Sequence, residues 1–130
     1  NLLKKQVKHQ GIVVKSYKIE IQKYSYIFDK NFKNGIIIDS ITDPNNVGAI
    51  YRSARAFGFD FVINSTRNSI LENSALINVA CGAFDAIDTY KANNISIAIK
   101  KLKSEGWWIV GLDHIAKQSI SDVLNIIDEK

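Results

Sequence analysis

Short apolar runs alternate with helix-length segments along this chain of 130 residues, and this order constrains the fold more than any other feature. The sequence predicts buried strands at residues 35–39 (GIIID), 59–64 (FDFVIN) and 107–113 (WWIVGLD). It predicts helices at residues 45–58 (NNVGAIYRSARAFG), 69–84 (SILENSALINVACGAF) and 94–106 (NISIAIKKLKSEG). Strands that alternate with helices of this length form parallel sheets with crossover connections. We therefore expect an α/β fold, a parallel sheet with helices on both faces.

Three further segments carry weaker signals. Residues 11–21 (GIVVKSYKIEI) favour an extended segment, residues 85–91 (DAIDTYK) a short strand, and residues 119–130 (SISDVLNIIDEK) a helix or an edge segment. No closing strand follows the last of these. We therefore expect the natural domain to continue beyond Lys130, and an upstream segment to precede residue 1.

The net charge of +4 is unevenly divided along the chain. Residues 1–33 carry eight lysines against Glu20 and Asp29, whereas the remaining residues carry more acidic than basic groups. A basic N-terminal third suggests contact with a polyanion, of which nucleic acid is the commonest. A lysine-rich face that only keeps the protein in solution is the competing interpretation of charge alone. Tyr24, Tyr26 and Phe28 lie among these lysines, and we expect them to be strand or packing residues.

Composition excludes several classes of protein. No apolar run approaches the ~18 residues that a membrane helix needs, and residues 1–10 contain no secretory signal. The single cysteine, Cys81, excludes an internal disulfide and is typical of a reducing cytoplasm. With only His9 and His114 beside it, there are too few nitrogen and sulfur ligands for structural zinc, so we expect no metal site.

Polar residues cluster where the strand at residues 35–39 passes into the following helix. In open parallel sheets ligands bind beyond the carboxyl ends of the strands, so this loop is a candidate site. Asp43 and Pro44 favour a turn, and either Asn45 or Asn46 is expected to cap the helix. Gly48, in the first turn, costs about 1 kcal/mol relative to alanine, which indicates that something approaches the backbone closely there.

The two arginines of this helix are not needed by its apolar face. At 100° per residue, one stripe is formed by Val47, Ile50, Ala54 and Phe57. Arg52 points almost opposite this stripe, with Arg55 to its side. Spacing alone leaves two interpretations of Arg52 open, a solvated surface arginine or a planar fork that binds a phosphate or a carboxylate.

Residues 43–63 (DPNNVGAIYRSARAFGFDFVI) closely resemble the first motif of the SpoU/TrmH-type RNA 2′-O-ribose methyltransferases, part of the knotted SPOUT superfamily. The motif positions are filled by Asp43, Pro44, Asn46, Gly48, Arg52, Ala54 and Gly58. Residues 8–14 (KHQGIVV) are similar to the His-Gln-Gly linker of the 23S rRNA guanosine branch, which joins an upstream RNA-binding domain to the catalytic domain. Residues 74–90 (SALINVACGAFDAIDTY) resemble the family's helix that ends in a Ser-x-Gly-Ala element, which reads Ala-Cys-Gly-Ala at residues 80–83 and puts Cys81 where serine or alanine is common. Residues 102–113 (LKSEGWWIVGLD) resemble the segment that precedes the cofactor loops.

The resemblance implies a division of the chain and a fold. Residues 1–33 correspond to a basic linker and first strand after a missing RNA-binding domain, and residues 34–130 to the N-terminal part of the catalytic domain. The family's second motif (Gly-Ser-Glu-Gly-like) and third motif (Ile-Pro-Met … Ser-Leu-Asn-Val-Ser) are absent from these residues. We therefore expect a SPOUT-like (Rossmann-like) domain without its C-terminal trefoil-knot segment. The cofactor-binding residues are expected mostly beyond Lys130, and it is left open whether these residues alone bind cofactor or turn over.

The resemblance also implies a reaction, transfer of a methyl group from S-adenosylmethionine to a ribose 2′-hydroxyl of 23S rRNA or tRNA, in a cytoplasmic homodimer. It places Asn46 and Arg52 in the catalytic site. Arginine has a pKa above 12, so we prefer a role in which Arg52 holds a phosphate or the developing alkoxide, with Asn46 orienting either Arg52 or the ribose. Arg55, Asn45 and His9 are candidate RNA contacts.

Two other classes of function stay open. One is a non-catalytic RNA-binding module that keeps a degenerate SPOUT-like fold. The other is an unrelated α/β nucleotide-binding enzyme, which is disfavoured because the chain has neither a Gly-x-Gly-x-x-Gly nor a P-loop motif. His114 is left out of the site because a lone loop histidine seldom has a specific role, and Trp107 and Trp108 are assigned to core packing rather than base stacking.

Overall fold

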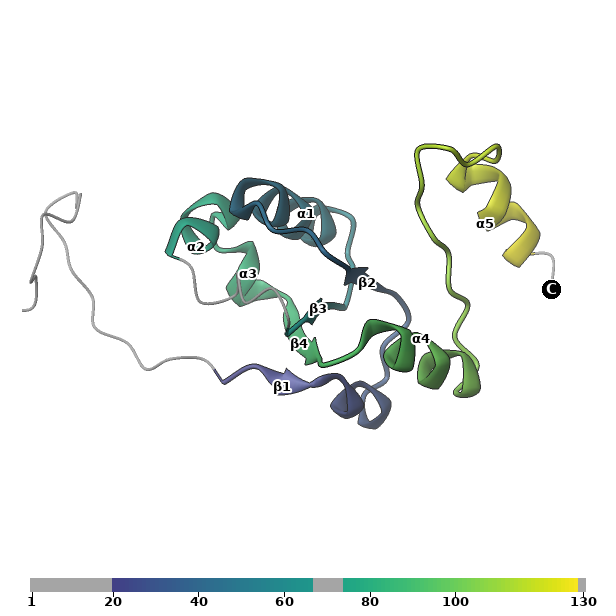
Figure 1. The fold of residues 1–130 in the computed structure, drawn as a ribbon, viewed down its shortest axis with the longest axis horizontal. Coiled ribbons are helices and arrows are strands. Elements are labelled where there is room, and N and C mark those ends of the chain that lie inside the picture. Colours follow the sequence, from purple (N-terminus) through teal and green to yellow (C-terminus); the bar gives the residue numbers. More distant parts are fainter. Residues whose placement is uncertain (1–19, 67–73, 129–130) are drawn as a thin grey trace, which may run out of the picture.

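The computed structural model describes residues 20–66 and 74–128, and its described strands form one parallel sheet (Figure 1). The strand order is β1-β4-β3-β2. The strands are β1 (Gln22–Lys23), β2 (Gly35–Ile38), β3 (Phe61–Ser65) and β4 (Asp88–Ala92). In register, Ile38 at the end of β2 lies beside Asn64, which in turn lies beside Lys91. The predicted parallel α/β architecture is confirmed.

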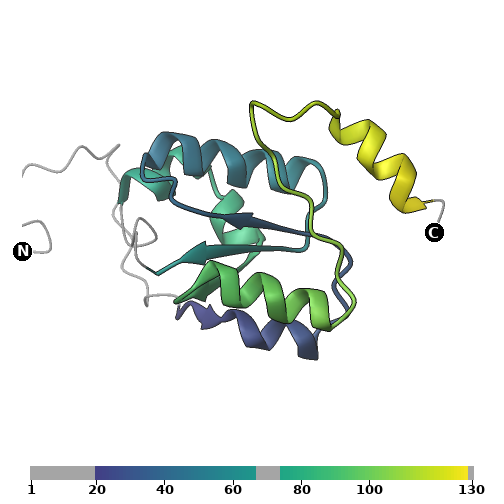
Figure 2. The same cartoon turned by 45° about the vertical axis from the view of Figure 1, so that its right-hand side comes forward.

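Helices cover both faces of this sheet, as predicted (Figure 2). Three helices pack on one face: α1 (Pro44–Ala56), α2 (Ser74–Ala80) and α3 (Ala83–Ala86). The 3-10 helix η1 (Tyr24–Asp29) and α4 (Ile95–Ser104) pack on the other. A last helix, α5 (Ile120–Asp128), lies apart from the sheet at the end of an extended segment. None of the helices in the described ranges is long and apolar enough to cross a membrane.

The central strand β3 joins two apolar clusters because its side chains alternate between the faces. Val62 belongs to the cluster under α1, whereas Phe61 and Ile63 belong to the cluster under α4. All five residues of β3 are buried, which confirms the strand predicted at residues 59–64, although the observed strand starts two positions later. Burial of each of its three apolar side chains, Phe61, Val62 and Ile63, contributes about 1.5–3 kcal/mol.

Helix α1 begins one residue earlier than the predicted range 45–58, and its N-cap is Asp43, two or three residues before the predicted caps Asn45 and Asn46. The Asp43 side chain accepts a hydrogen bond from the Asn46 backbone N–H at 3.1 Å. Pro44 occupies the first helical position, where its fixed φ suits the helix and its missing N–H costs nothing. The helix ends at Ala56, and Gly58 turns the chain with φ +72°, as predicted.

The apolar stripe predicted on α1 is only partly correct. Val47 and Ala54 are buried, and Ile50 packs at the edge of the same cluster. Phe57 lies one residue beyond the helix and is 78% exposed, because the chain leaves the helical path there. The centre of the buried face is instead Tyr51, which is fully buried under α1.

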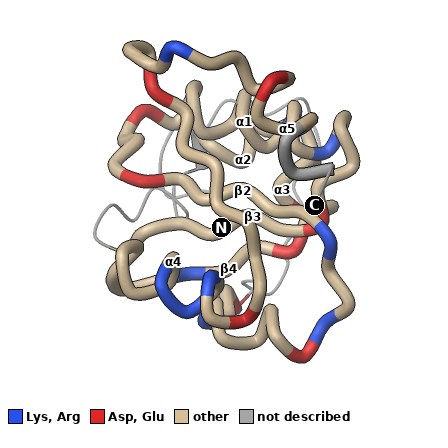
Figure 3. Tube along the Cα trace, turned by 90° about the vertical axis from the view of Figure 1, so that its right-hand side faces the viewer, with Lys and Arg blue, Asp and Glu red and all other residues tan. Residues whose placement is uncertain are grey.

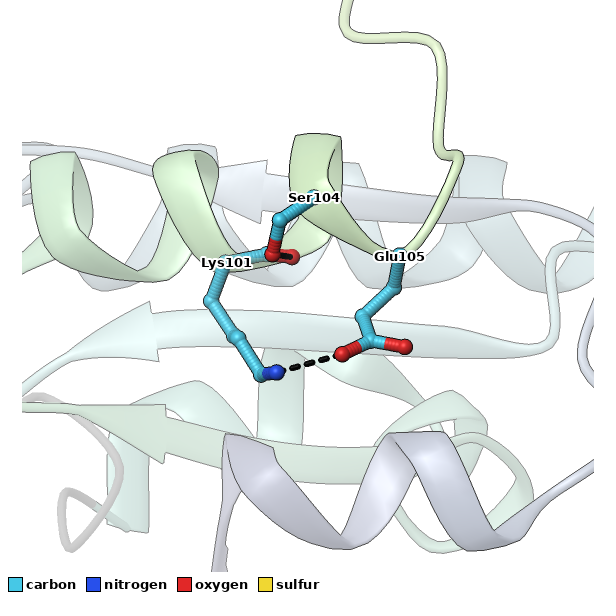
Figure 4. Close-up of polar contacts among 3 residues, drawn as sticks. All are labelled: Lys101, Ser104 and Glu105. Atoms are coloured by element: carbon cyan, nitrogen blue, oxygen red, sulfur yellow. Dashed lines mark hydrogen bonds and ion pairs between the residues drawn. The ribbon is translucent and has the colours of Figure 1, made fainter.

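Helix α4 agrees with its predicted amphipathic pattern. The Asn94 side chain caps it by accepting from the Ile97 backbone N–H at 3.1 Å, and Gly106 closes it with φ +88°. On its outer surface Lys101 pairs with Glu105, and the Ser104 hydroxyl donates to the Lys101 carbonyl at 2.8 Å (Figure 4).

The strand predicted at residues 107–113 is wrong, because this segment pairs with none of the described strands. Trp107 and Ile109 rest against the cluster under α4, but Trp108 and Leu112 are 60% and 81% exposed. The apolar run therefore marks an extended segment with one covered side and not a strand buried on both faces. The assignment of Trp108 to core packing is wrong for the same reason, whereas Trp107 packs its ring 5.4 Å from that of Phe61.

The N-terminal third begins to be described at Glu20, so the segment predicted at residues 11–19 and His9 lie outside the described residues. Residues 20–33 contribute β1, which pairs with β4, and then η1. Tyr24 and Phe28 pack their rings 6.4 Å apart on the inner side of η1, so they are packing residues, although of a helical turn and not a strand. Tyr26 is half exposed.

Candidate functional site

The carboxyl ends of β2, β3 and β4 meet at one edge of the sheet, and α1 starts from this edge. The loop between β2 and α1 exposes Asp39 and Ser40, which are joined by a hydrogen bond of 3.1 Å. Ser40 has φ +58°, so the chain turns sharply as it leaves the strand. This is the edge at which open α/β sheets bind their ligands, and it is where the sequence placed the site.

The start of α1 holds two asparagines with different constraints. The Asn45 side-chain amide donates to the Asp43 carboxylate at 3.2 Å, so Asp43 orients it as well as capping the helix. Asn46 is bound to Asp43 through its backbone N–H, and its side chain is exposed. The first turn of α1 therefore presents two amide groups to solvent beside the carboxyl edge.

Arg52 is exposed but held in place. Its Nη1 donates a hydrogen bond to the backbone carbonyl of Val79, in the last turn of α2. The last carbonyls of a helix lack partners within the helix and carry partial negative charge, so a guanidinium is a favourable donor there. Arg52 is thus anchored by one arm of its planar fork, and no second acceptor for it is found among residues 20–66 and 74–128.

The close approach predicted at Gly48 is confirmed, and the group that approaches is α2. A Cβ atom on Gly48 would lie 2.7 Å from Cγ1 of Val79 and 3.2 Å from the backbone nitrogen of Ala80. Because glycine lets the two helices meet at this point, the Val79 carbonyl comes within reach of Arg52 one turn later.

Asn46 and Arg52 lie on different sides of α1. Six residues separate them, which corresponds to about 120° around the helix and about 9 Å along it. Arg52 binds Val79 and not Asn46, so within the described residues the geometry favours the ribose as the group that Asn46 would orient. Asn45 is seven residues from Arg52 and so lies about 20° from it around the helix, on the same side.

Arg55 and Cys81 are exposed at two helix ends. Arg55 is in the last turn of α1, where its positive charge interacts favourably with the negative end of the helix dipole. Cys81 follows α2 with φ +49°, and its Sγ lies 3.5 Å from the Asn78 carbonyl. Gly82, with φ +80°, completes the turn predicted in the Ala-Cys-Gly-Ala element.

A buried polar network beneath α1 was missed by the sequence analysis. The Tyr51 hydroxyl accepts from the Asn64 side-chain amide at 2.8 Å and lies 3.1 Å from the Thr89 hydroxyl. Burial raises the pKa of Tyr51 to about 12. The available signal was Asn64, a polar residue in an otherwise apolar strand, but no pattern in the sequence identified its partners.

Other ionisable groups lie away from this edge. The backbone N–H groups of Lys33 and Asn34 donate to Asp60 at 2.8 and 3.1 Å and lower the pKa of its carboxyl. His114 is almost fully exposed, with its Nδ1 3.0 Å from the Asp113 carboxylate. In the described ranges no group of three or more His, Cys, Asp or Glu side chains is arranged to hold a metal ion.

The described part of the carboxyl edge does not by itself enclose a cofactor. A pocket for a ligand of this size buries most of the ligand surface, whereas Asp39, Ser40, Asn45 and Asn46 are all exposed. A hollow of about 290 Å³ lies elsewhere, between residues 110–119 and the start of α5, and its lining includes the apolar side chains of Val110, Leu112, Ile120 and Val123.

Chemically, the α1 edge offers hydrogen-bond donors with one fixed cation. Two amides and a guanidinium held by a backbone carbonyl suit a phosphate or a sugar hydroxyl. Among the described residues, the titratable side chains beside them are the carboxylates of Asp39 and Asp43.

Comparisons with known proteins give a family and a fold. The SpoU rRNA Methylase family matches residues 33–129. The chain is 34% identical over 121 residues to the 23S rRNA (guanosine-2′-O-)-methyltransferase RlmB of Coxiella burnetii, a match that covers 89% of this chain and 48% of that protein. It is 36% identical over 108 residues to an uncharacterized tRNA/rRNA methyltransferase of Synechocystis sp., covering 79% and 28% of the two chains.

A solved structure described as an RNA 2′-O ribose methyltransferase superimposes with a TM-score of 0.55 and 19% identity, over 82% of this chain and 37% of that one. At this identity the likeness concerns the fold alone. The chain spans 28% to 48% of the length of the two curated relatives, so their activities describe proteins longer than these residues.

Proposed function

The chain belongs to the SpoU rRNA methylase family, and from this membership we propose that its protein transfers a methyl group to a ribose 2′-hydroxyl of RNA. The methyl donor we propose is S-adenosylmethionine, which supplies an electrophilic methyl group when bound. We expect most of the residues that bind it to lie beyond Lys130, as the family resemblance implies. As substrate we propose 23S rRNA first and tRNA second, because relatives are named for both.

The observation that supports this role is the anchored guanidinium of Arg52 on the helix that starts at the carboxyl edge. A 2′-hydroxyl is a weak nucleophile and must lose its proton as it attacks. Arginine is a poor base, so Arg52 would instead stabilise the developing alkoxide or an adjacent phosphate by charge-assisted hydrogen bonds. Anchoring by Val79 fixes its position in advance, which is what such stabilisation requires.

The asparagines would act on the sugar and its neighbours. Asn46 would orient the ribose through its exposed amide, while Asn45 and Arg55 would contact the RNA backbone. His9, outside the described residues, is a further proposed RNA contact.

Four exposed lysines of the described residues are candidate contacts for RNA. Lys23 and Lys30 flank η1 and Lys100 and Lys103 lie on α4, and these two helices pack on the same face of the sheet. Figure 3 shows basic positions along α4. None of the four forms an ion pair with another described residue, whereas Lys101 is engaged by Glu105 and lies 5.5 Å from the Phe28 ring centre. Cations that are not neutralised within the protein are available to phosphates.

Assembly and compartment are part of the same proposal. We propose a homodimer in the cytoplasm, as the family resemblance implies. A non-catalytic RNA-binding module is the alternative.

The test follows labelled methyl transfer from S-adenosylmethionine to undermethylated 23S rRNA and tRNA by the natural-length protein. We expect transfer to a ribose 2′-oxygen, and a loss of about 10²–10³ in rate for Arg52→Ala. Arg52→Lys keeps a donor for Val79 but loses the planar fork, and is expected to restore stability more than activity.

The matched control is Lys117→Ala, which removes an exposed cation that the proposal does not assign to RNA binding and is expected to keep the parental rate. Equal rates for Arg52→Ala and the parent would refute the role of Arg52. RNA binding without any transfer would favour the binding module.

A further inference from the structure

The interface between α1 and the sheet is apolar except for one chain of hydrogen bonds. Asn64 comes from β3, Tyr51 from α1 and Thr89 from β4, so the chain ties the helix to two strands. The Thr89 hydroxyl also donates to the Ile87 carbonyl at 3.3 Å. Each hydroxyl then donates once and accepts once, with the direction running from Asn64 through Tyr51 to Thr89 and Ile87.

Two of the three side chains in this network are shielded from solvent, and the third, Thr89, is partly buried. Tyr51 is fully buried and Asn64 is 5% exposed. No buried side-chain nitrogen or oxygen of the described residues lacks a partner. Apolar side chains of the same shape would cover this interface about as well, because a buried hydrogen bond adds little net stability over such a replacement. The distinctive property of the network is therefore its geometry.

Hydrogen bonds define a position along the sheet that apolar contacts do not. Leucine or phenylalanine packs against a strand over a range of small shifts, and repacked cores lose a unique arrangement before they lose stability. The Tyr51 hydroxyl has one position between Asn64 and Thr89. Asn64 lies on the last shared rung of β2 and β3, beside Ile38, so the position is set relative to the carboxyl edge.

The residue after Tyr51 is Arg52, the anchored guanidinium of the proposed site. From the inner side of α1 the network fixes the helix on the sheet, and from the outer side Val79 holds the Arg52 side chain. We propose that Tyr51, with Asn64 and Thr89, is a positioning residue that sets where α1 presents Arg52 and Asn46 to the RNA. The effect on kcat that we expect from this positioning role rests on the proposed methyl transfer.

The test compares the natural-length parent with Tyr51→Phe and with the double variant Tyr51→Phe/Asn64→Leu. The single variant leaves the Asn64 amide without a partner, so it is expected to lose several degrees of Tm. The double variant replaces both groups by apolar ones and is expected to regain the parental Tm. Its kcat is nevertheless expected to stay at least about tenfold below that of the parent, with an unchanged KM for RNA.

A second pair of variants separates the hydroxyl from the shape of the side chain. Thr89→Ser keeps the hydroxyl and is expected to keep the parental kcat, whereas the isosteric Thr89→Val is expected to lower it. A readout independent of activity is hydrogen exchange of residues 44–56, which is expected to be several-fold faster in the double variant at equal Tm because α1 then samples several positions.

The outcomes separate the two proposals. If kcat recovers together with Tm in the double variant, or if exchange of residues 44–56 is unchanged, the network is only structural and the positioning role is refuted. If the parent transfers no methyl group to any RNA, the proposed function fails. The exchange measurement still decides in that case whether the network positions α1.

Discussion

Gly48→Ala is the substitution whose effect the structure determines most sharply, because helix propensity and packing oppose each other at this position. In an exposed helix, alanine is favoured over glycine by about 1 kcal/mol. At Gly48 the added Cβ would lie 2.7 Å from Cγ1 and 2.9 Å from Cβ of Val79, distances that real Cβ atoms do not show. Helix α2 must therefore move away from α1.

The cost of that movement exceeds the gain. Overpacking in a closely packed contact costs about 1–3 kcal/mol. Displacement of α2 also stretches the hydrogen bond from Arg52 to the Val79 carbonyl, which contributes about 0.5–1.5 kcal/mol. We expect Gly48→Ala to lower the free energy of unfolding by about 1–3 kcal/mol in spite of its better helix propensity.

Urea unfolding followed by circular dichroism measures this difference as a lower midpoint with an unchanged m value. Ser53→Ala, an exposed position in the same helix, reports propensity alone and is expected to be neutral or slightly stabilising. Val79→Ala added to Gly48→Ala removes Cγ1 and is expected to recover part of the loss. A Gly48→Ala protein that is more stable than the parent by about 1 kcal/mol would refute the close helix contact.

Three further results are expected. Asp43→Ala should destabilise the protein by about 1 kcal/mol in urea unfolding while Asp43→Ser retains most of the stability, and equal loss in both would contradict the cap. Burial raises the pKa of Tyr51 to about 12, whereas an unfolded tyrosine ionises near pH 10, so the contribution of Tyr51 to stability should be complete below pH 10 and fall as the pH rises towards 12. The decline in Tm over this range should be shallower in Tyr51→Phe. An identical decline in both proteins would argue against the buried hydroxyl. Lys100→Ala/Lys103→Ala should reduce the slope of log RNA affinity against log salt by about 1–2, whereas Lys117→Ala beside α5 should leave it unchanged.

The sequence predicted the elements whose signals are local. Helix α4 has both of its end signals within or beside it, Asn94 at the start and Gly106 at the end, and both were found. For α1 the predicted end agrees with the structure, whereas the predicted N-cap does not. Asp43, Asn45 and Asn46 are all good caps, and the choice depended on Pro44, whose preference for the first helical position makes the preceding residue the cap.

Residues 107–113 show why an apolar run is insufficient to predict a strand. The run is apolar enough for a buried strand, but only Trp107 and Ile109 pack against the core. A strand also needs a neighbouring strand to accept its hydrogen bonds, and among the described residues this segment has none. Pairing is a property of segments distant in sequence, so it cannot be read from seven consecutive residues.

For the candidate site, the sequence by itself determined which chemical groups are present and, through the strand–helix order, that Asn45, Asn46 and Arg52 belong to a helix starting at the carboxyl edge. Only the tertiary structure decided what holds them. Gly48 admits α2, Val79 anchors Arg52, and Tyr51 is tied to Asn64 and Thr89. The physical reason is the range of the forces involved. Capping, turns and amphipathic periods act over a few residues, whereas helix contacts and buried hydrogen bonds join residues 13 to 38 positions apart.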